Sequence, residues 1–145
     1  MSEYDESLQD IGLIDSSELF QGLLNIPINI NSTLCGGILD MKPNYAKTAL
    51  VTSNEMIFDD EKLIHGGFIF GLGDTAMGVV SRTTGRKSVT LSANISYLRP
   101  SVGKYLIAKA EMIKDGKKTS YLRTNIYDEN DKLVATMDAN YCYVD

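Results

Sequence analysis

The sequence has one histidine, His65, no tryptophan, and only two cysteines, Cys35 and Cys142. A metal site made of protein ligands needs a cluster of histidine, cysteine or carboxylate side chains at short spacing. The two cysteines lie far apart in the chain and form no such spacing. We therefore expect no metal centre, and we expect two reduced thiols in a cytoplasmic protein.

Basic residues and long apolar runs are also scarce. The chain has 14 Lys and Arg against 19 Asp and Glu, which gives a formal net charge of −5. A nucleic-acid partner is disfavoured because phosphate backbones require a broad basic surface. No apolar run reaches the ~20 residues that cross a bilayer. The first ten residues, MSEYDESLQD, are acidic and polar, unlike a secretory signal. We expect neither a nucleic-acid nor a membrane partner.

The chain of 145 residues has the length of one domain, and its sequence shows no internal repeat or linker. Residues 1–33 are predicted to form an acidic tail and a short helix over DSSELFQGLLNIP. In that helix Asp15 is a candidate N-cap, and Glu18 is three positions on, as in a capping box. Residues 34–145 are predicted to form the main domain.

Strand patterns begin near residue 34. Two candidate strands, in STLCGGILDM and YAKTALVTSNEM, come before a glycine-rich segment. Four more follow it, in KSVTLSANISYLR, KYLIAKAEMIK, TSYLRTNIYD and KLVATMDANYCYV. In the first of these four, polar and apolar residues alternate, so the two sets should lie on opposite faces. The polar set is Thr90, Ser92, Asn94 and Ser96. Because the last three links are short, we expect these four strands to form an antiparallel meander.

The glycine-rich segment, HGGFIFGLGDTAMGVV, predicts a central helix that packs against this meander. Its residues are small or apolar at almost every position except Asp74. Gly67, Gly71, Asp74 and Gly78 follow one another at intervals of 4, 3 and 4, so they share one helical face. Either the glycines allow close approach to another element, or the face admits a ligand towards Asp74. An unpaired buried carboxylate costs several kcal/mol, so a purely structural Asp74 would require a partner.

The segment HGGFIFGLGDTAMG resembles the signature of hotdog-fold acyl-CoA thioesterases of the phenylacetate-pathway and 4-hydroxybenzoyl-CoA type. In that family His-Gly-Gly is followed by an acidic residue nine positions after the His. ANISYLRPSVGK resembles the later strand and proline-containing turn of the same family. The resemblance covers residues 34–144. It implies an α+β hotdog fold, in which a curved antiparallel sheet wraps a central helix, and assembly at least as a homodimer.

The resemblance also implies an acyl-CoA ligand, with coenzyme A as part of the substrate and no separate cofactor. It implies that Asp74 is the nucleophile or general base in thioester hydrolysis, and that the backbone N–H of Gly66 polarises the thioester carbonyl. Eight residues separate the two, which is about 12 Å along a helix, too far for one thioester to touch both. They can meet only if a second copy lies antiparallel, so that each site takes one group from each subunit.

Two more positions follow from the resemblance. Thr90 matches the place of a Ser or Thr hydroxyl that helps to orient the water in some relatives, although a β-branched residue also suits any strand. Asp59 stands six residues before the His, where many relatives have Asn or Gln. An amide can donate a hydrogen bond, whereas an ionised carboxylate cannot.

Coenzyme A carries a pyrophosphate and a 3′-phosphate, which cationic side chains and free N–H groups can bind. Basic residues cluster just after the predicted helix and beside the proline turn. They serve either as phosphate contacts or as parts of solvated loops. The candidate contacts for coenzyme A are Gly67, Arg82, Arg86, Lys87 and Arg99.

Hydrolysis of an acyl-CoA thioester is therefore the leading predicted function. The alternative is a non-catalytic acyl-CoA-binding or sensing module, which Asp59 and the N-terminal helix favour. A hydratase or dehydratase on the same scaffold is a third reading. Those enzymes usually pair a histidine with an acid, whereas His65 stands at the start of the predicted helix, where a hydrogen-bonded structural role is expected.

Overall fold

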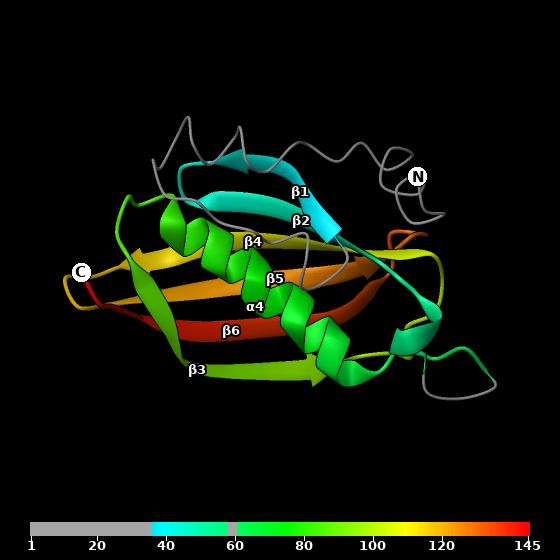
Figure 1. The fold of residues 1–145 in the computed structure, drawn as a ribbon. Coiled ribbons are helices and arrows are strands. Elements are labelled where there is room, and N and C mark those ends of the chain that lie inside the picture. The colour runs from blue at the N-terminus through cyan, green and yellow to red at the C-terminus, as the bar shows by residue number, and fades with distance from the viewer. Residues whose placement is uncertain (1–35, 58–60) are drawn as a thin grey trace.

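One long helix lies across a six-stranded antiparallel sheet in the computed structural model, which describes residues 36–57 and 61–145 (Figure 1). The strands are β1 (Gly36–Lys42), β2 (Tyr45–Val51), β3 (Ser88–Tyr97), β4 (Tyr105–Asp115), β5 (Thr119–Asp128) and β6 (Leu133–Tyr143). The helix α4 (Gly66–Arg82) follows β2, after a short 3-10 turn η1 (Asn54–Met56). The predicted order of two strands, a helix and four strands is confirmed. The predicted segment 1–33, Cys35 and Asp59 lie outside the described residues.

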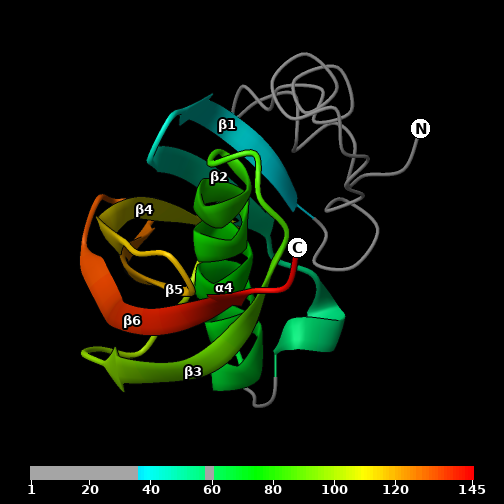
Figure 2. The ribbon, with the colours of Figure 1, turned by 90° about the vertical axis from the view of Figure 1, so that its left-hand side faces the viewer.

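The sheet order is β1-β2-β4-β5-β6-β3, and every neighbouring pair is antiparallel. The predicted four-stranded meander is therefore wrong for β3, although β4, β5 and β6 do form one. β3 pairs with β6, and β4 pairs with β2 instead. The reason is that α4 ends beside the β1–β2 turn, where the Asn44 N–H donates to the Thr83 hydroxyl, and the chain then crosses to β3 at the opposite edge of the curved sheet (Figure 2). A short link permits pairing of successive strands, but it does not require it.

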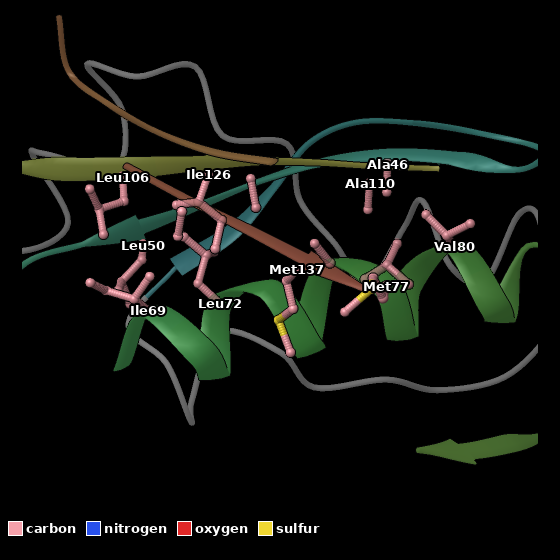
Figure 3. Packing of buried hydrophobic residues seen from close by; sticks show 14 of the residues in the cluster. Ala46, Leu50, Ile69, Leu72, Met77, Val80, Leu106, Ala110, Ile126 and Met137 are labelled. Carbon is pink, nitrogen blue, oxygen red and sulfur yellow. The ribbon is translucent and has the colours of Figure 1, made fainter. Parts of the chain in front are cut away.

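The face of α4 that meets the sheet is aliphatic. Ile69, Leu72, Met77 and Val80 pack against residues of the central strands such as Leu106 and Ile126 (Figure 3). Gly73 brings the helix close to the sheet, because a Cβ atom there would lie 2.5 Å from the sulfur of Met137. No helix in the described part of the chain is long and apolar enough to span a bilayer.

β3 forms one edge of the sheet and is mostly exposed. Its register with β6 shifts between Thr90 and Ser92. As a result Thr90 faces the same side as Ala93 and Ile95, which pack against the core. The expected grouping of Thr90 with the polar set of this strand is therefore wrong. A β-bulge adds one residue to a strand and so reverses the alternation on either side of it.

Candidate functional site

Asp74 lies in the middle of α4, half-buried, on the side of the helix that faces β6 and β3. The Thr90 hydroxyl on β3 donates a 2.8 Å hydrogen bond to Asp74 Oδ1. The Tyr141 hydroxyl on β6 lies 2.6 Å from the same oxygen. The two donors come from cross-strand partners in the β3–β6 ladder. The structure thus brings the predicted residues Asp74 and Thr90 together.

The carboxylate of Asp74 is held by neutral hydroxyl groups. Across residues 36–57 and 61–145 the single ion pair is Arg86–Asp145, so Asp74 has no cationic partner there. Its second oxygen, Oδ2, accepts no hydrogen bond from the same residues. Burial raises the pKa of Tyr141 strongly, and the negative charge of Asp74 adds to this rise, so the phenol stays protonated as a donor. The arrangement leaves Asp74 with Oδ1 held by two hydroxyls and Oδ2 without a partner in the described part of the chain.

At the N-terminus of α4, one N–H group lacks an acceptor within residues 36–57 and 61–145. His65 is the N-cap, and its Nδ1 accepts the Gly67 N–H at 3.0 Å, which matches the structural role expected for this histidine. The Gly66 N–H has no acceptor among the residues whose placement is described. The Tyr97 hydroxyl donates to the Gly66 carbonyl at 2.8 Å. Free N–H groups at a helix N-terminus carry partial positive charge, which suits an oxyanion.

A hollow of about 420 Å³ opens beside this helix end. Its lining is mainly apolar, and Gly66 borders it. The other lining residues are Leu63, Ile64, Ile69, Tyr97, Leu98, Arg99, Pro100 and Ser101. The predicted coenzyme A contact Arg99 is therefore close to the N-terminus of α4.

The remaining predicted contacts for coenzyme A are spread out. Arg82, Arg86 and Lys87 lie at the other end of α4. Arg86 binds both side-chain oxygens of Asp145 at 3.0 Å, donates to the Lys117 carbonyl at 2.9 Å and stacks on the Tyr143 ring. A phosphate would have to displace these partners.

Arg82 Nη1 is buried and forms no hydrogen bond with the described chain. Lys87 is exposed. The Gly67 N–H is already occupied by His65. The structure therefore does not gather the predicted contacts for coenzyme A into one cluster.

Sequence reasoning missed Tyr141 and Tyr97, which contact Asp74 and Gly66 respectively. For Tyr141 a signal was present. It falls on the alternating apolar face of the last strand, and a buried phenol usually requires a hydrogen-bond partner. Asp74 was a suitable acceptor, because this carboxylate required a partner and none had been identified from the sequence.

Comparison with known proteins agrees with the predicted resemblance. An esterase-named protein of Archaeoglobus fulgidus is 31% identical over 99 residues, and the match covers 68% of this chain but 64% of that protein, less than two thirds of its length. The acyl-coenzyme A thioesterase PaaI of Escherichia coli is 29% identical over 99 residues, which cover 68% of this chain and 70% of PaaI. The solved structure of E. coli PaaI aligns with a TM-score of 0.74 at 25% identity, covering 79% of this chain and 83% of that one.

The predicted α+β hotdog fold, a central helix wrapped by a curved antiparallel sheet, is confirmed by the strand order and by this structural likeness. The family model of the thioesterase superfamily matches residues 61–135, about half of the chain, and these residues include both Gly66 and Asp74. On this match and this fold, the chain belongs to the thioesterase superfamily.

Proposed function

We propose that this protein hydrolyses acyl-CoA thioesters at a site formed between two copies of the chain. The observation that carries the proposal is the state of Asp74, whose Oδ1 is held by two hydroxyls while Oδ2 has no partner in the described residues. A carboxylate held by neutral donors keeps its negative charge available to a reacting group. The activity of E. coli PaaI, named an acyl-coenzyme A thioesterase, supports the substrate class.

The chemistry requires few groups. With Asp74 as general base, Oδ2 takes a proton from water, and the water oxygen bonds to the thioester carbon. The carbonyl oxygen becomes an oxyanion beside the Gly66 N–H, the C–S bond then breaks, and the sulfur leaves as the thiol of coenzyme A after protonation. With Asp74 as nucleophile, Oδ2 bonds to the thioester carbon, the C–S bond breaks, and coenzyme A leaves as its thiol after protonation; water then cleaves the resulting anhydride to the free acid and restores the Asp74 carboxylate. Both routes need the same two groups, a carboxylate and an oxyanion donor.

The need for a second copy comes from distance. Gly66 and Asp74 are eight residues apart on one helix, about 12 Å. β3 is a ten-residue edge strand, and Val89, Leu91 and Tyr97 on it are each more than half exposed. A long exposed edge with apolar side chains is suited to pairing with another strand. We therefore propose that the β3 edges of two copies meet, so that Gly66 of each faces Asp74 of the other.

Complementation between two inactive variants tests this arrangement. Asp74→Asn removes the base or nucleophile. Gly66→Pro removes the N–H at the first helical position, where proline is tolerated, and His65 before it is already extended at φ −62° and ψ 132°. Each variant alone should release little thiol from a series of acyl-CoAs. Mixed and reassembled, they should recover roughly a quarter of the wild-type rate, because about half of the dimers are mixed and each has one intact site.

Three outcomes separate the alternatives. No recovery in mixtures that form heterodimers would place both groups in one subunit and overturn the shared site. Thermal stabilisation of the wild type by acyl-CoA without thiol release would support the non-catalytic binding module instead. If neither stabilisation nor release occurs with short, long and aromatic acyl-CoAs, both functions fail. The coenzyme A contacts Gly67, Arg82, Arg86, Lys87 and Arg99 and the role of Asp59 stay predictions.

A further inference from the structure

Tyr141 is a core tyrosine whose hydroxyl lies within hydrogen-bond distance of both the side chain and the main-chain carbonyl of Asp74. Its side chain is 3% exposed, and it lies opposite Thr90 in the β3–β6 ladder. The hydroxyl oxygen is 2.6 Å from Asp74 Oδ1 and 2.7 Å from the Asp74 main-chain carbonyl oxygen. A phenol has one proton to donate, and a charged acceptor forms the stronger bond, so the proton goes to the carboxylate.

The helix borders this tyrosine at Gly78. Gly78 lies one turn after Asp74, and a Cβ atom there would be 3.6 Å from the Tyr141 hydroxyl oxygen and 3.9 Å from its Cε2. These are ordinary van der Waals distances, so this part of the glycine face borders a side chain of the sheet, and alanine would also fit at position 78. The ring is fixed by the surrounding core, so the hydroxyl has a defined position relative to α4.

Tyr141 and Thr90 differ in how firmly they are held. Thr90 belongs to an exposed edge strand, whereas Tyr141 belongs to β6, which is paired on both sides by β5 and β3. Both donate to the same oxygen of Asp74. Two donors on Oδ1 restrict the rotation of the carboxylate about its last bond, and they leave Oδ2 as the oxygen with no partner in the described chain. The more rigid of the two supports is the buried one.

We infer that Tyr141 is a positioning residue, whose hydroxyl holds Oδ1 of Asp74 so that Oδ2 is presented to the reacting thioester. The inference rests on the proposed hydrolysis. Tyr141 does not touch the substrate in this role, so its loss should lower kcat and leave KM nearly unchanged. Loss of one hydrogen bond to a charged group corresponds to a decrease of about 10- to 100-fold in kcat.

Tyr141→Phe tests this directly, because it removes the hydroxyl and keeps the ring. Tyr143→Phe is the matched control, since Tyr143 is also buried on β6, and its hydroxyl bonds a different carboxylate, that of Asp115. Thiol release and the thermal unfolding midpoint are measured for both. We expect a decrease in kcat for Tyr141→Phe alone, at a KM within about twofold of the wild type. If the Tyr141 hydroxyl had only a structural role, Tyr141→Phe would lower the thermal unfolding midpoint, as Tyr143→Phe could, without this selective loss of kcat.

A double variant provides a second measurement that does not depend on how well one variant folds. With Asp74→Asn the group to be positioned is no longer a reactive carboxylate, so adding Tyr141→Phe should not lower the residual rate further. An unchanged kcat in Tyr141→Phe, or a further loss in the double variant, would overturn the positioning role while leaving hydrolysis intact. Absence of thiol release by the wild type would instead show that the proposed function has failed, and the inference with it.

Discussion

Thr90 and Tyr141 face each other across the β3–β6 pair, and their hydroxyls meet at one oxygen of Asp74. This convergence depends on the shift in register between Thr90 and Ser92. Without it, Thr90 would point to the opposite face of the sheet and could not reach the helix. The bulge is therefore the feature of the backbone that assembles the candidate site.

Replacing Thr90 with valine removes one of the two donors and keeps a β-branched side chain suited to a strand. We expect kcat for thiol release to fall about tenfold, because the hydrogen bond goes to a charged acceptor. The thermal midpoint should change little, since Thr90 is exposed. Ser96→Ala, an exposed position on the same strand, should leave kcat at the wild-type value. Equal rates for Thr90→Val and the wild type would remove Thr90 from the mechanism.

Gly66 can be tested with two substitutions that differ in one group. Gly66→Ala and Gly66→Pro both place a Cβ atom about 3.1 Å from the Tyr97 ring, but only proline removes the N–H. We expect a loss of about 10²- to 10³-fold in kcat for Gly66→Pro, typical of a lost oxyanion donor. Gly66→Ala keeps the N–H, so it should lose much less of the wild-type kcat than Gly66→Pro does. If both variants lose the same activity, the crowding of Tyr97 rather than the N–H is responsible.

The sequence predicted the order of elements because each has its own periodicity, and it predicted α4 and Asp74 because a charge in an apolar, glycine-rich segment is conspicuous. It could not predict the position of β3, because short links are compatible with several pairings. The orientation of Thr90 was missed for a related reason, since a bulge depends on tertiary packing that periodicity does not record. Tyr141 joins Asp74 from 67 residues away, a proximity that only the folded sheet creates.

The exposed edge of β3 predicts how the chain assembles. Leu91 is 62% exposed on this strand, and a carboxylate placed there would be buried by a second copy. We expect the wild type to be a dimer by analytical ultracentrifugation, and Leu91→Asp to raise the dissociation constant by about 100-fold or more. Thiol release should fall in proportion to the dimer. Ile113→Asp, at an exposed position on β4, is the control and should leave dimer and rate unchanged.

The Arg86–Asp145 pair predicts a small pH dependence of stability. Hydrogen bonds from Arg86 lower the pKa of Asp145 below its ordinary value of 3.8. Because the folded-state pKa is the lower one, the pair stabilises the fold above pH 3.8, and this contribution is lost as the pH falls through the folded-state pKa. Asp145→Asn should therefore lower the thermal midpoint at neutral pH by about one or two degrees, and not at strongly acidic pH. A difference that persists in acid would exclude the ion pair as its cause.

Gly73 and Gly78 give a matched pair for the packing of α4, since both are interior helix positions. A Cβ at Gly73 would lie 2.5 Å from Met137 Sδ, 3.2 Å from Thr124 Cγ2 and 3.3 Å from Ile126 Cδ1, whereas at Gly78 the nearest atom is 3.6 Å away. Alanine gains up to ~1 kcal/mol over glycine in a helix, but overpacking costs about 1–3 kcal/mol.

Gly73→Ala should therefore lower the free energy of unfolding by about 1–2 kcal/mol, because overpacking outweighs the gain in helix propensity. Gly78→Ala should keep or raise that free energy, because its new methyl group makes only ordinary contacts. Urea denaturation of both variants measures the difference. If Gly73→Ala were the more stable of the two, the helix could not approach the sheet at Gly73 as closely as the structure has it.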